Sequence, residues 1–186
     1  KLNSQQPLIS TSLEELSNAV QVEMIEKDKL DLGFVRLASV PNDLEMKVVL
    51  RDSFSLVVPK DHPIQIQDFH SVNQFRDESF VLFSSDYSNL YYEQIIGICK
   101  DAGFSPRIRH KSVHALTIFK LVENGMGVAI VPTSLKEGYE LNVRFMQVPN
   151  IPQFTELSAI WKAENRNPAL KQVLPLILKK SELMIS

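Results

Sequence analysis

The sequence is short of cysteine, of basic charge and of long hydrophobic runs, and each shortage excludes a class of protein. Cys99 is the only cysteine among 186 residues, which excludes an internal disulfide and a thiolate metal cluster. It lies in the run I-I-G-I-C, and we expect a small core residue. The formal net charge is −2, so the chain alone has no electrostatic basis for gripping a nucleic-acid backbone. No apolar stretch of about 18 residues and no signal peptide are present, so neither a membrane span nor secretion is indicated.

Recognisable catalytic and metal-binding motifs are also lacking. The sequence has no G-x-S-x-G, no G-K-[ST] phosphate loop and no G-x-G-x-x-G. The G-M-G at 125–127 precedes an apolar run, so it predicts a helix stop followed by a tight turn. The four histidines show no metal-ligand spacing, and His114 could either reach a cleft or cap a helix. We therefore expect no enzyme, no cofactor and no metal.

The composition is that of a globular protein, with 44% hydrophobic and 23% charged residues, enough for one domain or two small lobes. Short apolar runs alternate with helical patterns, which predicts an α/β fold with parallel sheets. The expected strands are Leu8–Leu16, Leu30–Val35, Met46–Leu50, Phe54–Val58, Phe80–Phe83, Arg107–Lys111, Val128–Val131, Val143–Val148 and Thr155–Trp161. The expected helices are Asn18–Asp28, Asn89–Ala102, Val113–Asn124 and Asn167–Met184, the last with a kink or break at Pro175.

The stretch K-L-D-L-G-F-V-R at 29–36 is central to the functional interpretation. Leu30–Val35 is nearly continuous in apolar residues, which is typical of a buried strand in a parallel sheet. Arg36 then falls at the carboxyl end of that strand, where ligands bind in open α/β sheets. Its guanidinium can hold a carboxylate through two parallel hydrogen bonds. The alternative is an exposed arginine paired with an acidic neighbour, and position alone favours neither.

A second candidate site is the polar loop S-S-D-Y-S at 84–88, between the run F-V-L-F and the helix Asn89–Ala102. Its small hydrogen-bonding side chains can either form a turn and cap the helix or surround a polar ligand. A helix start at the end of a buried strand is a natural anion site, which favours the ligand. Tyr87, Tyr91 and Tyr92 lie in the same loop and first turn, where one could form an aromatic wall for a ligand and at least one must pack inward.

Four segments, in order, resemble the effector-binding domain of LysR-type transcriptional regulators. They are K-L-D-L-G-F-V-R, V-V-L-R-D-S-F-S-L-V-V-P-K-D-H-P, F-V-L-F-S-S and L-V-E-N-G-M-G-V-A-I-V-P. The resemblance covers residues 7–184 and implies the fold of type II periplasmic binding proteins, two Rossmann-like lobes with the inducer in the cleft between them. It implies a lobe I of 1–53 plus 153–186 and a lobe II of 54–152. The first strand and helix of lobe I and the N-terminal winged helix-turn-helix are then expected to lie outside this chain.

The resemblance also implies a function, a set of partners and a set of ligand contacts. We expect a bacterial, cytoplasmic regulator that senses a small, carboxylate-bearing, aromatic-type metabolite. Its partners would be that inducer, further copies in a homodimer or homotetramer, and DNA only through the absent N-terminal domain, with no membrane. The alternatives are a periplasmic solute-binding protein, which an export signal would identify, and an enzyme, for which no nucleophile or acid–base pair is found. The implied effector contacts are Ser17, Asn18, Arg36, Ser84, Ser85, Asn89, Leu90 and Tyr91.

Overall fold

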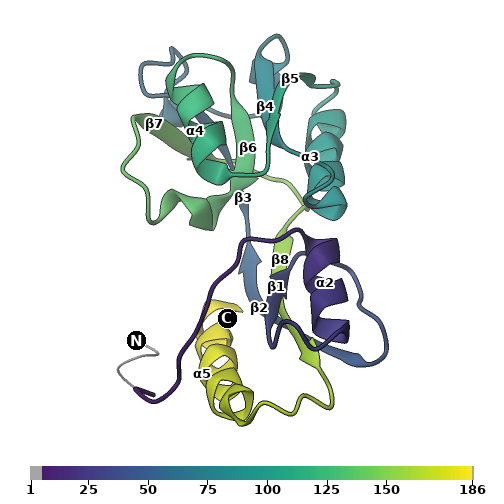
Figure 1. Ribbon diagram of the computed structural model, residues 1–186. Coiled ribbons are helices and arrows are strands. Elements are labelled where there is room, and N and C mark those ends of the chain that lie inside the picture. The colour runs from purple at the N-terminus through teal and green to yellow at the C-terminus, as the bar shows by residue number, and fades with distance from the viewer. Residues whose placement is uncertain (1–5, 186) are drawn as a thin grey trace. The chain divides into compact units, whose positions relative to one another are not determined.

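The computed structural model describes residues 6–185, and the chain divides into two compact units. Unit 1 combines the chain up to Arg51 with the chain from Glu156 onward, and unit 2 is Asp52–Thr155. The polypeptide therefore passes between the units twice, once after Arg51 and once after Thr155 (Figure 1). In the described part of the chain, no helix is both long enough and apolar enough to cross a bilayer.

Unit 1 is built on a three-stranded sheet in the order β1-β8-β2. β1 (Gly33–Val35) pairs antiparallel with the central strand β8 (Thr155–Lys162), and β2 (Leu44–Asp52) lies on the other side of β8. Helix α2 (Asn18–Glu26) precedes β1, and α5 (Pro168–Ile185) follows β8 as the yellow helix of Figure 1.

The core of unit 1 is small and joins α2 to its sheet. Ile25 of α2, Val35 of β1 and Ile160 of β8 are fully buried, and Leu44 of β2 is nearly so. These side chains form one apolar cluster. Each fully buried aliphatic side chain stabilises the folded state by about 1.5–3 kcal/mol, so this cluster fixes α2 against β1.

Unit 2 holds an antiparallel and a parallel strand pairing. β3 (Phe54–Pro59) lies between β6 (Ala129–Pro132) and β7 (Val143–Gln147) and runs antiparallel to both. β4 (Ser79–Phe83) and β5 (Arg107–Ser112) are parallel, and a bridge from Phe80 to Val128 links β4 to the residue before β6. The helices are α3 (Asn89–Asp101) and α4 (Ala115–Glu123), with short 3₁₀ turns at Ile66–Asp68, Val72–Phe75 and Thr133–Lys136.

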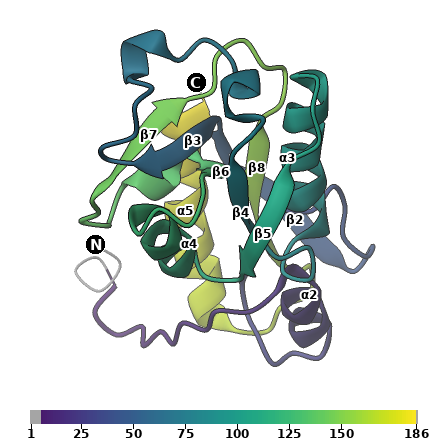
Figure 2. The same cartoon turned by 90° about the horizontal axis from the view of Figure 1, so that it is seen from above.

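Two apolar clusters lie on opposite faces of β3. Leu56 and Val58 pack in a cluster with Ile95 and Ile98 of α3, whereas Val57 packs with Phe119 of α4. Successive strand residues point to opposite faces, so one strand serves both clusters. Figure 2 shows α3 and α4 flanking the strands of unit 2. This double burial explains why β3 appears in the sequence as a continuous apolar run.

The predicted mixed α/β fold is confirmed, but the predicted parallel pairing is only partly right. β4 and β5 are parallel as expected, whereas the strand within Leu30–Val35 is limited to β1 and runs antiparallel to β8. A continuous apolar run indicates burial on both faces of a strand, but in β1 only Gly33 and Val35 are buried and Phe34 is 41% exposed. Such a run does not specify the direction of the neighbouring strand, which is set by residues far away in the sequence.

Two further predictions are wrong, the strand at Leu8–Leu16 and a break at Pro175, whereas a kink at Pro175 stays a prediction. Leu8–Leu16 forms no strand, and Leu8 and Leu13 are 98% and 95% exposed. No described strand pairs with this segment, and an extended segment without a hydrogen-bonded neighbour is not a strand. Helix α5 continues through Pro175 without the expected break.

Candidate functional site

The predicted contacts in unit 1 lie together where β1 ends and α2 begins. The side chain of Asn18 is buried, and its Nδ2 donates to the carbonyl of Arg36 at 3.1 Å. The amide of Arg36 donates back to Oδ1 of Asn18 at 3.4 Å. Ser17 is the N-cap of α2 and accepts from the amide of Val20 at 3.4 Å. Asn18 therefore holds the main chain of Arg36 on both sides, and the half-buried arginine extends from a fixed strand end.

Gln21, which the sequence analysis missed, continues this arrangement along β1. Its Oε1 accepts from the amide of Phe34 at 2.8 Å. A Cβ added at Gly33 would lie 2.8 Å from the same oxygen and 3.0 Å from Ile160, so only glycine lets α2 approach β1 this closely. The glycine of L-D-L-G-F-V-R thus serves helix packing. The sequence separation of 13 residues between Gln21 and Phe34 left no local signal for this contact.

The predicted contacts in unit 2 lie in the loop after β4 and in the first turn of α3. Ser84 and Ser85 are half-buried, and the amide of Ser84 donates to the carbonyl of Ser112 at 2.9 Å, which continues the β4–β5 pairing. Asn89 is exposed and its amide group donates to Glu93 at 2.9 Å, and Leu90 is 37% exposed. The loop thus presents two hydroxyl groups beside the start of a helix.

Tyr91, in contrast, lies in the core of unit 2. It is 4% exposed, and its hydroxyl donates to the carbonyl of Ile130 at 2.7 Å. Its ring packs against Phe54 and Phe83. These contacts account for the tyrosine through packing and one buried hydrogen bond, so we leave it out of the ligand contacts proposed below.

The ends of β4 and β5 lie side by side because these strands are parallel, with Phe83 opposite Ser112. Each strand leads to a helix, α3 after β4 and α4 after β5. His114 is the N-cap residue of α4, and its amide donates to Oγ of Ser112 at 3.1 Å. Two helix starts and a histidine therefore adjoin the Ser84–Ser85 loop, and both helix dipoles favour an anion there.

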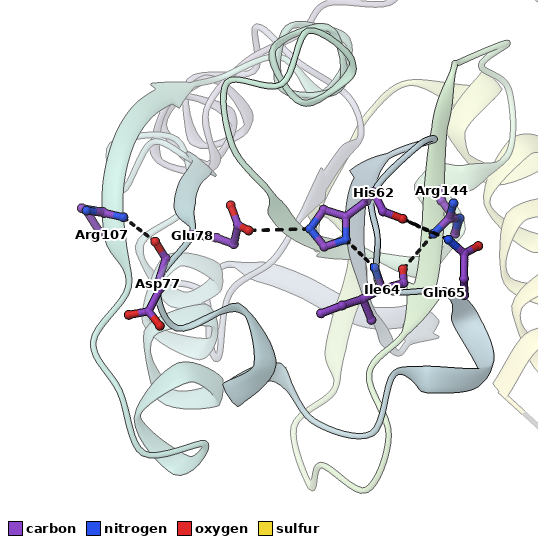
Figure 3. A network of polar contacts seen from close by, with 7 residues as sticks. All are labelled: His62, Ile64, Gln65, Asp77, Glu78, Arg107 and Arg144. Atoms are coloured by element: carbon purple, nitrogen blue, oxygen red, sulfur yellow. Dashed lines mark hydrogen bonds and ion pairs between the residues drawn. The ribbon is translucent and has the colours of Figure 1, made fainter.

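Figure 3 shows another polar network of unit 2, and its contacts are structural. The guanidinium of Arg144, on β7, donates to the carbonyls of Lys60, His62 and Ile64, with distances of 3.3 Å to His62 and 2.8 Å to Ile64. Nδ1 of His62 accepts from the amide of Ile64 at 3.2 Å, and Nε2 lies 3.7 Å from Glu78. These three bonds of Arg144 all go to main-chain carbonyls, so the arginine holds a loop in place.

Unit 2 also contains a cavity of about 220 Å³ that involves none of the predicted contacts. It is lined by His70–Val72, by Ile98, Asp101 and Ala102 at the end of α3, and by the segment 148–153. Among the described residues, no cluster of three or more histidine, cysteine or acidic side chains is arranged to hold a metal ion.

The two units together define a mixed α/β protein with polar, anion-compatible groups at its strand ends. A sequence model described as the LysR substrate binding domain matches residues 1–181, so the chain belongs to this family. The fold is therefore type II periplasmic-binding-protein-like, as solved LysR effector-binding domains also show.

The relatives in the comparisons are transcriptional regulators. The chain is 25% identical to the HTH-type transcriptional regulator AlsR of Bacillus subtilis over 168 residues, which is 90% of this chain and 56% of AlsR. It is 21% identical to CatR of Pseudomonas putida over 94% of this chain and 60% of CatR. The chain thus spans little more than half the length of these relatives. Since they are regulators, the expectation that the chain is no enzyme is confirmed.

Solved structures agree on the fold. The effector-binding domain of BenM with its effector benzoate superposes with a TM-score of 0.80 at 19% identity, covering 97% of this chain and 82% of that one. The effector-binding domain of QuiR in complex with shikimate gives a TM-score of 0.76 at 19% identity, covering 92% and 81%.

Proposed function

We propose that this chain is the ligand-sensing part of a LysR-type regulator and that it binds a small metabolite bearing a carboxylate. Units 1 and 2 would be lobes I and II, and residues of both would contact the ligand. The observation that carries the proposal is the pair of hydrogen bonds between Asn18 and the main chain of Arg36. A guanidinium on a fixed backbone loses less conformational freedom when it binds a carboxylate.

The other proposed contacts supply hydrogen bonds to the remaining oxygens of the ligand. Ser17 and the start of α2 would act in unit 1. Ser84, Ser85 and the start of α3 would act in unit 2, where exposed Leu90 offers an apolar contact. BenM and QuiR are described with benzoate and shikimate, both carboxylates, which supports the class of ligand. Neither name identifies the ligand of this chain.

For the whole protein we propose a cytoplasmic regulator that assembles as a homodimer or homotetramer and contacts DNA through a separate N-terminal domain. The net charge of −2 supports the view that this part does not itself grip DNA. A full-length CbnR structure with its target DNA supports the same organisation by family analogy. Ligand would shift the protein between two arrangements that differ in affinity for it.

Calorimetry with benzoate and shikimate tests the carboxylate site, with benzamide as the uncharged analogue. We expect Arg36→Ala to weaken carboxylate binding at least about tenfold, because a charge-assisted hydrogen bond contributes roughly 1.5–3 kcal/mol. Arg109→Ala removes the same charge from an exposed position of β5 and should change nothing. Equal affinities of the wild type and Arg36→Ala for benzoate would remove Arg36 from the site. Binding of benzamide as tight as that of benzoate would refute the proposal that the site recognises a carboxylate.

A further inference from the structure

Two glutamine side chains form hydrogen bonds between helix α3 and the segment 149–155. Nε2 of Gln94 donates to the carbonyl of Phe154 at 2.9 Å, and Nε2 of Gln153 donates to Oδ2 of Asp101 at 2.6 Å. Gln94 and Asp101 are seven residues apart, which places them two turns apart on one face of α3. The two contacts therefore run along the helix and hold the segment at two points.

Each glutamine depends on its nitrogen for this contact. Oε1 of Gln94 and Oε1 of Gln153 are buried and accept no hydrogen bond from the described residues. A buried amide oxygen without a partner is unfavourable, so packing alone does not explain two such side chains in one contact. What the two amides have in common is that they join α3 to the segment 149–155.

The segment 149–155 is the last part of unit 2 before the chain passes to unit 1, and its final residue, Thr155, begins β8. It turns at Asn150, whose φ of +53° lies in the left-handed region. The cavity of about 220 Å³ lies against the segment, since Asp101 and the residues 149–153 are part of its lining. The segment is thus held by separate polar contacts beside open space, and it has room to shift.

We propose that Gln94 and Gln153 couple the ligand loop at Ser84–Ser85 to the segment 149–155 through α3. The inference rests on the proposed function, because α3 begins at the loop proposed to bind the ligand. A ligand that orders the first turn of α3 would make local opening of the helix less frequent. The two amides would carry that change to the segment leading into β8.

Hydrogen exchange, read by mass spectrometry on peptides covering 150–155, tests the coupling without any ligand. Leu90→Gly loosens the first turn of α3 and should speed this exchange about fivefold, the factor that corresponds to a glycine inside a helix. In the Gln94→Leu/Gln153→Leu background, Leu90→Gly should leave the exchange at 150–155 unchanged. Thr117→Gly, at an exposed position of α4, is the matched control and should have no effect there.

The coupling is wrong if Leu90→Gly leaves exchange at 150–155 unchanged, or changes it equally with and without the two glutamines. Should the double variant fail to fold by circular dichroism, Gln94→Met alone carries the same comparison. Benzoate then separates the two proposals. Protection of 84–90 and 150–155 supports both, and protection of 84–90 alone overturns the coupling. Protection of neither, with the Leu90→Gly effect intact, overturns benzoate binding and leaves the coupling standing.

Discussion

Gly127 provides a sharp stability prediction, because both its backbone conformation and its surroundings exclude a side chain. Its φ is +143°, and an added Cβ would lie 2.4 Å from the carbonyl oxygen of Ser79. That oxygen accepts from the amide of Val128 at 2.8 Å, and the amide of Val81 donates to the carbonyl of Val128 at 2.8 Å. Gly127→Ala must therefore displace the main chain where β4 is hydrogen-bonded to Val128, the residue before β6.

Gly125→Ala is the matched control for the size of this effect. Gly125 has a φ of +72°, but nothing lies within 4 Å of its added Cβ. It should therefore cost only the left-handed backbone penalty of an alanine, about 1 kcal/mol. Gly127→Ala carries a backbone penalty at least as large, because a φ of +143° lies outside the left-handed helical minimum, and it also weakens one or both backbone hydrogen bonds, each contributing about 1 kcal/mol, so we expect at least roughly 3 kcal/mol in total.

Urea unfolding followed by circular dichroism measures both costs. The dependence of the unfolding free energy on urea should stay constant across the variants, so that a shifted midpoint reports a change in stability. The two sites differ in the contact with Ser79 and in φ, which is +143° at Gly127 and +72° at Gly125, and both differences make Gly127→Ala the costlier substitution. If Gly127→Ala costs no more than Gly125→Ala, the clash does not exist and the inferred close approach of the backbone of Ser79 to Gly127 is refuted.

Two other predictions concern buried polar groups of unit 2. Tyr91→Phe should cost about 1–3 kcal/mol in urea unfolding, because the carbonyl of Ile130 loses its buried donor, and it should leave benzoate affinity unchanged; a large loss of affinity at wild-type stability would return Tyr91 to the ligand site. Burial raises the pKa of the Cys99 thiol from 9.0 to about 12, so iodoacetamide at pH 8 should label it only after unfolding, and rapid labelling of the folded chain would contradict this. As the pH rises, the Cys99 thiol ionises in the unfolded chain before it ionises in the folded chain. The contribution of the buried thiol to folding stability is therefore complete below pH 9 and is lost as the pH rises towards 12.

The buried strands of unit 2 were predictable because their signal is local. β3, β4 and β6 are buried on both faces, and each appears in the sequence as a short apolar run between turn residues. Strand direction was not predictable in the same way. β1 is apolar like a parallel strand, yet its antiparallel partner β8 lies more than a hundred residues further along the chain.

The strand predicted at Leu8–Leu16 was wrong for a related reason. Its apolar content is that of a strand, but strand formation also needs a neighbour that can complete the backbone hydrogen bonds. The described residues provide none, and Leu8 and Leu13 remain exposed. Composition within a segment therefore predicts what the segment can become, whereas pairing decides whether it does.

In the candidate site, too, the local features could be predicted and the long-range contact could not. The position of Arg36 follows from the strand that precedes it, and Ser17 and Asn18 are both of residue types that favour a helix cap. In the structure Ser17 takes the cap, which leaves the Asn18 side chain to bind the main chain of Arg36. That second role spans 18 residues and could not be found from the helix itself.

Gly33 connects these observations. The missing Cβ lets α2 lie against β1, and only at that distance can Gln21 and Asn18 reach the amides of Phe34 and Arg36. The glycine and the arginine of L-D-L-G-F-V-R are therefore parts of one arrangement, in which the first admits the helix and the second is fixed by it. Their joint occurrence in the motif has a physical cause that neither residue shows by itself.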